Sequence, residues 1–382
     1  MAVKTVSANP YVWEISEQCG DAISELQKLR PVLAGRLAEH ALQTARQHLG
    51  HDSCANQLPA VLLAESLYEQ GRLEEADNLL RFRLPVIRSS GSLECAARAY
   101  AVLARVSMHT GQRDFALSSL RDARALGERR CWPRLVAVST AEYSQILLED
   151  GNLAAAADSI REFAGLIEES TTASTVVRRA MRMQLALLEF RLAICRGAGD
   201  AIAPALTQLY AEQARGNCDA RWTLQLQLQL AAAHLRGDRE FLARDILTKA
   251  LEVGAGNGLC MSFIDAGPWV RGLIATLCRE PTEEDPAILD LLPYIRNLLR
   301  HINRTVAASS SKRSTHEVSQ PLTRRESGIL QLIANGLSNK RIAQRLDITP
   351  ETVKSHAKNI FFKLAAQTRA QAVARAEALG II

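Results

Sequence analysis

Hydrophobic positions in roughly the first 300 residues recur with the spacing of amphipathic helices, and short polar breaks interrupt them at regular intervals. Each break holds a glycine that is followed five or six positions later by an alanine. These glycines are Gly71, Gly111, Gly151, Gly197 and Gly237. They step by 40, 40, 46 and 40 positions. The pattern predicts pairs of helices, with each glycine in the left-handed conformation that ends the first helix of its pair.

A repeat of about 40 residues is typical of an α-solenoid built from antiparallel helix pairs. The small alanine in each second helix permits the two helices to pack closely. The segment LAGRLAEHAL around Gly35 is interpreted as a further, degenerate unit. In such an array the first helices of successive pairs line a concave surface suited to a ligand or peptide. No residue of the sequence stands out as the anchor of that partner.

Some segments of the body depart from the pattern. Thr223–Leu230 alternates with the period of a strand, but Gln and Leu both favour helices, so a helix is predicted. Gly254–Gly258 lacks the Lys-Ser/Thr of a phosphate loop and is predicted to end a helix. The acidic stretch Glu280–Pro286 is predicted to be a surface turn before a helix that reaches Ile302.

The Ser-rich residues 303–320 show no helical periodicity. We predict that they form a flexible linker, too long and too polar to transmit a rigid movement. The expected domains are therefore a helical-repeat sensor or interaction domain at residues 1–302, the linker, and a small module at residues 321–382.

The small module reads as four short helices with capping signals. Thr323 and Glu326 form a capping box, Ser338 caps a second helix, and Thr349 caps a third that starts with Pro350. Thr368 and Gln371 open a fourth helix. The three-residue turn between the second and third helices predicts a helix-turn-helix, which binds DNA through its second, recognition helix.

Residue types along this module suggest how it contacts DNA. One face of the third helix is predicted to anchor it in the core through Val353, Ile360, Phe361 and Leu364. Lys354, Ser355 and Lys358 lie mainly on the other face. Lysine donors suit guanine edges in the major groove, so these three are the predicted base readers. The predicted phosphate contacts are Asn339, Lys340, Thr352, Lys363 and Arg369. His356 is ambiguous, since a neutral imidazole packs locally more often than it reads a base.

Residues Leu322–Leu379 resemble the LuxR/FixJ/NarL class of helix-turn-helix domains. The resemblance rests on the segments LTRRE, SNKRIAQRL and TVKSHAKNIFFKL and on Arg369. It departs from the class at Gly328, where Glu is usual, and after Leu364, where the usual Gly-Val is missing. The resemblance implies that Lys354, Ser355 and Lys358 read bases and that the fourth helix pairs two copies into a dimer. A shallow stripe of Ala370, Val373, Ala374 and Ala378 is the expected dimer face.

The repeats, over Leu62–Ile274, look like the tetratricopeptide-like arm of the large MalT-like LuxR regulators. MSFIDAGPWVRGLI, at Met261–Ile274, is similar to the F-x-D-x-G-P segment that closes that arm. In those regulators an ATPase domain precedes the arm, and the arm binds a small effector or a partner. The P-loop pattern GxxxxGK[ST] does not occur in this sequence. The chain is therefore either the back half of such a regulator or a short relative.

Charge divides along the same boundary. Residues 320–382 hold ten Lys/Arg and four Asp/Glu, a net of +6, which leaves 36 basic and 37 acidic residues before them. A basic module on a nearly neutral body indicates a polyanion-binding domain or a merely solvated basic face. Eight cysteines show no zinc-site spacing, and no run of about 18 apolar residues suggests a membrane span. We expect a cytoplasmic location, no membrane partner, no metal and no cofactor.

Three functions compete. The first is an all-α transcription regulator, an activator, with a tetratricopeptide-like α-solenoid followed by a four-helix LuxR-type module. It would read a two-fold symmetric site as a homodimer, bind a small-molecule or protein effector at the solenoid and contact RNA polymerase. The second is a helical-repeat scaffold or adaptor whose C-terminal module mediates interactions. The third, an enzyme, is disfavoured because no nucleophile, base and orienting group can be combined.

Overall fold

The structure is a computed structural model. It describes residues 10–51, 53–169, 174–216, 219–279, 286–313, 324–334, 337–346, 348–363, 369 and 372–373. Every regular element in these residues is helical, and none of these helices is both long and apolar enough to cross a membrane. The chain divides into two compact units, Met1–Ser309 and Ser310–Ile382.

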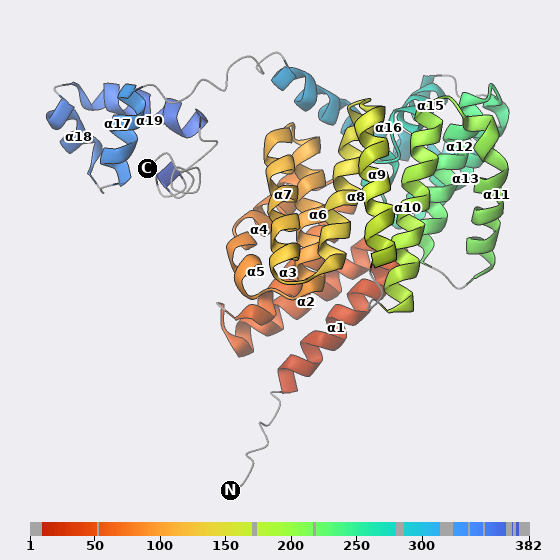
Figure 1. The fold of residues 1–382 in the computed structure, drawn as a ribbon, viewed down its shortest axis with the longest axis horizontal. Helices are drawn as coiled ribbons and strands as arrows, with labels where there is room; N and C mark the ends of the chain where they lie inside the picture. The colour runs from red at the N-terminus through yellow and green to blue at the C-terminus, as the bar shows by residue number, and fades with distance from the viewer. Residues whose placement is uncertain are drawn as a thin grey trace, which may run out of the picture. The chain divides into compact units, whose positions relative to one another are not determined.

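Helix pairs build the first unit (Figure 1). Two helices, α1 (Pro10–Gln27) and α2 (Pro31–Leu49), and a short 3-10 turn, η1 (Cys54–Asn56), precede the repeats. The repeats themselves are α3 (Gln57–Glu69) with α4 (Leu73–Arg81), α6 (Leu93–His109) with α7 (Arg113–Arg129), α8 (Pro133–Glu149) with α9 (Leu153–Glu169), α10 (Thr175–Cys195) with α11 (Gly199–Arg215), and α12 (Ala220–Arg236) with α13 (Glu240–Asn257). A short helix, α5 (Leu84–Ser90), interrupts the series. The predicted α-solenoid is therefore present, and the alternating segment Thr223–Leu230 is helical.

Four of the five predicted glycine turns are confirmed. Gly71, Gly111, Gly151 and Gly197 have φ of 76°, 70°, 74° and 85°. At each turn, the N–H after the glycine donates to a carbonyl five residues back, as in Asn152 to Leu147 at 3.0 Å. This bond satisfies a carbonyl that the helix end leaves unpaired. The alanine of every second helix is buried, from Ala76 to Ala243.

The fifth turn was predicted wrongly. Gly237 has an ordinary φ of −96°, and Asp238 takes the left-handed conformation with φ of 54°. Aspartate tolerates this region better than most residues. A Cβ at Gly237 would meet the exposed carboxylate of Asp200, which would have to move aside.

Of two further glycine predictions, one differs from the structure and one is confirmed. Gly35 lies inside α2, where a side chain would collide with Ser66 of α3, so it permits close helix packing rather than a turn. The prediction that Gly254–Gly258 ends a helix is confirmed, because α13 ends at Asn257 and the left-handed Gly258 follows with φ of 67°. Gly254 itself is helical. A glycine can be required either for a left-handed turn or for close packing where no side chain fits. The neighbouring sequence does not distinguish these two roles.

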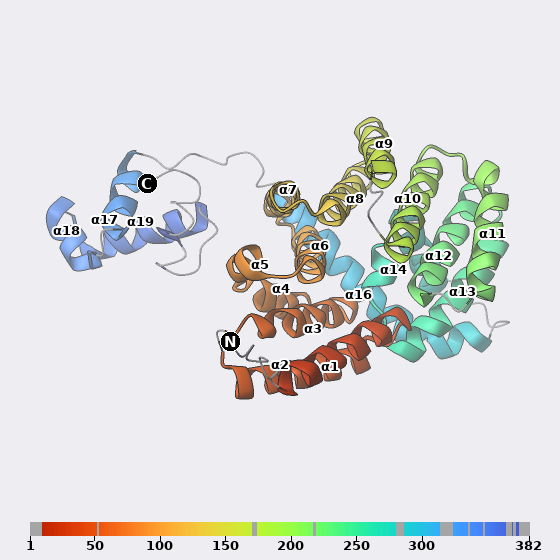
Figure 2. The same ribbon diagram turned by 60° about the horizontal axis from the view of Figure 1, so that its bottom comes forward.

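The end of the first unit folds back into the concave face of the solenoid (Figure 2). This closing segment comprises α14 (Met261–Ile264), α15 (Pro268–Arg279) and the first part of α16 (Pro286–Arg313). One hydrophobic core joins it to α3 and α6 and includes Tyr68, Tyr100, Phe263, Leu298 and Ile302. The backbone N–H of Cys260 donates to the carbonyl of Glu69 at 2.7 Å. The concave surface predicted for a ligand is thus covered in part by the chain itself.

The predicted flexible linker is wrong in its first part. The α16 helix continues to Arg313, so residues 303–313 are helical. No glycine or proline stands between Pro293 and Pro321, and Ala, Ser, Lys and Arg do not break a helix as those two residues do. Residues 314–320 lie outside the described residues, as do the predicted surface turn at 280–285 and the capping residue Thr323.

Candidate nucleic-acid interface

Three helices of the second unit pack as a helix-turn-helix with a preceding helix. They are α17 (Arg324–Ala334), α18 (Asn339–Leu346) and α19 (Pro350–Lys363). Their shared core contains the predicted anchors Val353 and Ile360 together with Ile329, Leu330, Ile333, Ile342 and Ala357. Phe361 and Leu364, also predicted to anchor this face, have no described side chains. The fourth helix is described only at Arg369, Ala372 and Val373.

Side-chain caps fix where the second and third helices begin. The Ser338 Oγ accepts a hydrogen bond from the Arg341 N–H at 3.4 Å, and the Thr349 Oγ1 accepts one from the Thr352 N–H at 3.2 Å. Both caps were predicted. They satisfy amide groups that a helix start leaves unpaired, and therefore define the short connection between α18 and α19.

The recognition helix α19 carries the three predicted base readers. Lys354 is exposed and forms an ion pair with Glu351 at 3.2 Å, in which the two side chains are 71% and 81% exposed. Such a surface pair contributes little, so the lysine is free to exchange this partner for another. Ser355 and Lys358 lie on the same helix, but their side chains lie outside the described residues. His356 is partly buried.

Two predicted phosphate contacts have internal partners instead of being free. Arg369 donates hydrogen bonds to the carbonyl oxygens of Ile333 at 3.3 Å and of Leu337, and to Asn339 Oδ1 at 3.4 Å. Arg369 therefore ties the end of α17 to the start of α18. The sequence predicted Arg369 as a phosphate contact, and nothing local to it indicated that its planar guanidinium would bond to these internal acceptors.

The other predicted contacts are compatible with a phosphate. Lys340 and Thr352 are exposed in the first turns of α18 and α19, where backbone N–H groups favour an anion. Lys363 ends α19, and its side chain lies outside the described residues. Within the predicted dimer stripe, Val373 is partly buried against the core of its own module. Ala370, Ala374 and Ala378 are not described.

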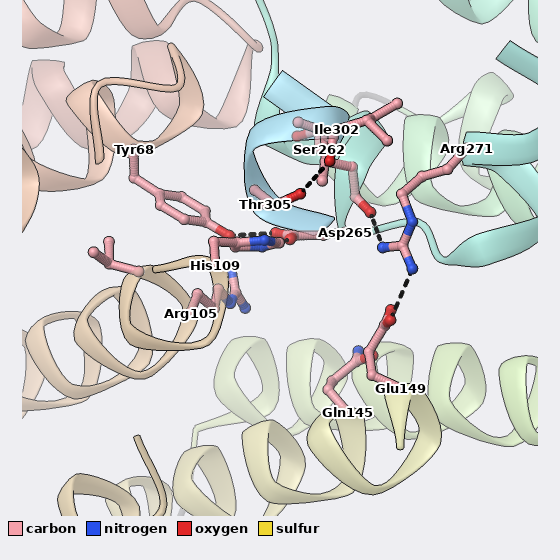
Figure 3. A network of polar contacts seen from close by, with 12 residues as sticks. Tyr68, Arg105, His109, Gln145, Glu149, Ser262, Asp265, Arg271, Ile302 and Thr305 are labelled. Carbon is pink, nitrogen blue, oxygen red and sulfur yellow. Dashed lines mark hydrogen bonds and ion pairs between the residues drawn. The ribbon is translucent and has the colours of Figure 1, made fainter. Parts of the chain in front are cut away.

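A second polar site lies on the concave face of the first unit, around Asp265 (Figure 3). Its carboxylate accepts a hydrogen bond from the Tyr68 hydroxyl at 2.7 Å and lies 2.7 Å from His109 Nε2. The Arg191 guanidinium donates to the Asp265 carbonyl at 2.9 Å and also pairs with Glu149. The sequence pointed to this aspartate only through the F-x-D-x-G-P resemblance and assigned it no partner.

The charges at this site balance one another. Arg271 bridges Glu149, at 3.0 Å, and the Ile264 carbonyl, at 2.9 Å. Burial raises the pKa of Asp265. The hydrogen bond and charge of His109 and the charge of Arg105 lower this pKa by more than burial raises it, so the pKa lies below its usual value. The closing segment is therefore joined by polar contacts to helices of four repeats, through Tyr68, His109, Glu149 and Arg191.

Glu69 titrates differently from Asp265. Its carboxylate accepts hydrogen bonds from the Ser262 hydroxyl at 2.8 Å and the Ser262 N–H at 3.3 Å. Burial is the main cause that raises its pKa to about 7, and the charge of Asp265 adds to the rise. Among the described residues, no group of three or more His, Cys, Asp or Glu is arranged to hold a metal ion. Cys54 and Cys131 are exposed, so the cysteines are not uniformly core residues.

Two families match this sequence. The family described as MalT-like TPR region covers residues 27–280, and the family of bacterial regulatory proteins of the luxR type covers residues 320–376. The two matches fall on the helix pairs and on the module of α17–α19.

Individual relatives extend over both units. The chain is 24% identical over 336 residues to the HTH-type transcriptional regulator MalT of Vibrio campbellii, which covers 83% of the chain and 35% of the relative. It is 24% identical over 321 residues to the HTH-type transcriptional regulator AlkS of Pseudomonas putida, and this alignment covers 83% of the chain and 34% of the relative. A shorter alignment, 46% identical over 63 residues, relates the chain to the nitrate/nitrite response regulator protein NarL of Escherichia coli. It covers 16% of the chain and 29% of the relative. The chain thus spans about a third of the length of these curated relatives.

Proposed function

The chain belongs to the family with a MalT-like TPR region, whose match covers residues 27–280, and we propose that it regulates transcription by binding double-stranded DNA. The observation that carries this proposal is the capped α18–α19 pair, with Lys354 exposed on the recognition helix. A helix of this kind enters the major groove with its N-terminal residues against the base edges. In this function Lys354, Ser355 and Lys358 read bases.

Phosphate contacts set the register of the module on the duplex. Lys340 and Thr352 lie at the starts of α18 and α19, and Lys363 lies at the end of α19. Arg369 and Asn339 act first by holding α17 and α18 together, and the same guanidinium adds positive charge beside the backbone.

Two copies bind one site with two-fold symmetry, and the protein acts in the cytoplasm as an activator that contacts RNA polymerase. The fourth helix is the proposed dimer face. Its apolar stripe is small, so the dimer forms on DNA, with half-sites about one helical turn apart.

The solenoid senses an effector or a protein partner. Because the closing segment covers part of the concave face, the effector competes with that segment or binds beside it. The α16 helix is anchored in the solenoid by Ile295, Leu298 and Ile302 and runs on to Arg313. A rearrangement of the closing segment therefore moves the start of the connection to the DNA-binding module. An effector acts through its difference in affinity for the two arrangements.

Selection from random duplex DNA tests the function. The full chain is expected to enrich a two-fold symmetric sequence, and binding to that sequence should weaken steeply as salt rises. The selection is repeated with Lys354→Ala and Lys358→Ala combined, which leaves the core of the module unchanged. Failure of the wild-type chain to enrich any sequence would favour the scaffold alternative, in which the C-terminal module binds proteins.

A further inference from the structure

One face of α16 carries three arginines in a row. Arg296, Arg300 and Arg304 are all exposed, and each follows the last by four positions. A rise of about 1.5 Å per residue places successive arginines roughly 6 Å apart along the helix. The opposite face holds the buried residues Ile288, Leu291, Ile295, Leu298 and Ile302. The packing against the solenoid therefore directs the three guanidinium groups to solvent. We call them the α16 arginine row.

The three side chains of the α16 arginine row differ from other arginines of the first unit in their ion pairing. In the part of the chain that the structure describes, no ion pair of these three residues is recorded, whereas Arg98, Arg105, Arg191 and Arg271 all pair with carboxylates. Burial lowers the pKa of His301, and the charges of Arg304 and Arg300 lower it further. Among the described residues, the three guanidinium groups therefore carry positive charge that no carboxylate pairs with.

The short connection between α16 and α17 keeps the α16 arginine row near any DNA that α19 binds. The ten residues between Arg313 and Arg324 span at most about 40 Å when fully extended. Arg304 lies nine residues before Arg313, about 14 Å along the helix. Once α19 occupies its site, Arg304, the nearest member of the row, is held within roughly 55 Å of the start of α17, which is about 16 base pairs of duplex. Flanking DNA, with one charge per ~1.7 Å of axis, is then present at high local concentration.

We propose that the α16 arginine row binds the phosphate backbone of DNA that flanks the sequence read by α19. This inference rests on the proposed function and adds a second, sequence-independent contact made by the solenoid unit. It lengthens the DNA footprint beyond the half-sites without changing the sequence preference. Because α16 is anchored in the closing segment, the contact also depends on how that segment is packed.

The test compares two duplexes with the full chain. The short duplex is the shortest that retains sequence-dependent binding, and the long duplex adds 15 base pairs of arbitrary sequence on each side. Arg296→Gln, Arg300→Gln and Arg304→Gln are combined in one variant. A control variant combines Arg36→Gln, Arg121→Gln and Arg182→Gln, which removes the same charge from exposed arginines of α2, α7 and α10. A third variant replaces the row with lysines.

Wild-type protein is expected to bind the long duplex at least tenfold more tightly than the short one at low salt. The glutamine row variant should lose this advantage while it binds the short duplex normally. Its salt dependence on the long duplex should be shallower by roughly two to three in log–log slope, about 0.9 for each lost phosphate contact. The lysine variant and the control variant should behave as wild type.

Several results would overturn the proposal. These are an unchanged preference for the long duplex in the glutamine row variant, or an equal loss in the control variant. Normal DNA binding with lost recruitment of RNA polymerase would assign the row to a protein partner instead. Sequence-dependent binding to the short duplex measures the proposed function separately. If the wild-type chain binds neither duplex, both ideas fail.

Discussion

The imidazole Nε2 of His109 lies 2.7 Å from Asp265 Oδ1, although 156 positions separate the two residues. His109 ends the first helix of one repeat, and Asp265 follows α14 in the closing segment. Tyr68, from the preceding repeat, donates to the other carboxylate oxygen. A single side chain therefore joins two repeats to the segment that folds back across them.

Substitution of Asp265→Asn tests this junction. The amide removes the charge that His109 and Arg105 stabilise and presents an N–H group to one of two donors. We expect the free energy of unfolding to fall by about 1–3 kcal/mol, as measured by chemical denaturation. Asp245→Asn is the matched control, since the described partner of Asp245 is the exposed Lys249, and it should change stability by less than about 0.5 kcal/mol. Equal effects of the two substitutions would show that the junction contributes nothing.

Glu69 should make stability depend on pH near neutrality. Its folded pKa of about 7 exceeds the ordinary value of 4.5, so the folded state holds the proton more tightly than the unfolded state. Stability from this group is complete below pH 4.5 and is lost as pH rises to about 7. Glu69→Gln removes the titration and keeps an oxygen for Ser262. Relative to wild type, the variant should gain roughly 1–3 kcal/mol more at pH 8 than at pH 5. Parallel stability–pH curves for the two proteins would contradict this.

Gly71 and Gly151 form a matched pair for testing the closing segment. Their φ values are nearly equal, so Ala at either position meets the same backbone strain, about 1–2 kcal/mol. Open space surrounds a Cβ at Gly151, whereas at Gly71 a Cβ would lie 2.7 Å from His301 Cε1 and 3.1 Å from Cys260 Sγ. We expect Gly71→Ala to cost a further ~1–3 kcal/mol in thermal or chemical unfolding. Equal decreases in the free energy of unfolding at both glycines would mean that His301 of α16 moves aside without destabilising the fold.

Base readers and phosphate contacts should differ in how they affect specificity. Lys354→Ala and Lys358→Ala are each expected to weaken the selected site by roughly 1–3 kcal/mol and to relax the preference at one base pair. Lys340→Ala should weaken all sequences equally and reduce the salt slope by about one. Titrations of single-base variants of the site measure both effects. Identical behaviour of the two classes would reverse the assignment.

Arg369 should affect the fold of the module before it affects DNA binding. Arg369→Ala removes the three hydrogen bonds that tie α17 to α18 and is expected to lower the melting temperature of the second unit and abolish binding to every sequence. Arg369→Lys keeps the positive charge but not the planar fork, so it should recover little. If the lysine variant restored DNA binding fully, charge beside the backbone would be the main role of this residue.

Local signals explain why the repeats could be predicted. A glycine turn and a buried alanine lie within one helix pair, so Gly111 and Ala116 express a preference that needs no distant partner. The closing contacts could not be found this way, because Tyr68 and Asp265 meet only after five repeats have curved. The left-handed conformation falls on Asp238 rather than Gly237 at the last turn, and the spacing of the glycines did not indicate this shift of one residue.

The module of α17–α19 shows the same division. Ser338 and Thr349 were identified because capping is a short-range rule, and both caps are present. The bonds of Arg369 to Ile333 and Asn339 were missed because they cross 36 and 30 positions. The error at residues 303–313 had another origin. Serine content was read as flexibility, although the stretch contains no residue that ends a helix.

Because the closing segment returns to α3, the contacts between them require a fixed number of repeats in between. An open array can gain or lose a helix pair, because each pair touches only its neighbours. Here Cys260 must meet Glu69, and Arg221 of α12 reaches Glu65 of α3 at 3.3 Å. One pair more or less would turn these partners away from each other. The array of repeats therefore has a fixed length. Duplication of a repeat, which lengthens an ordinary solenoid without loss, would break these contacts here.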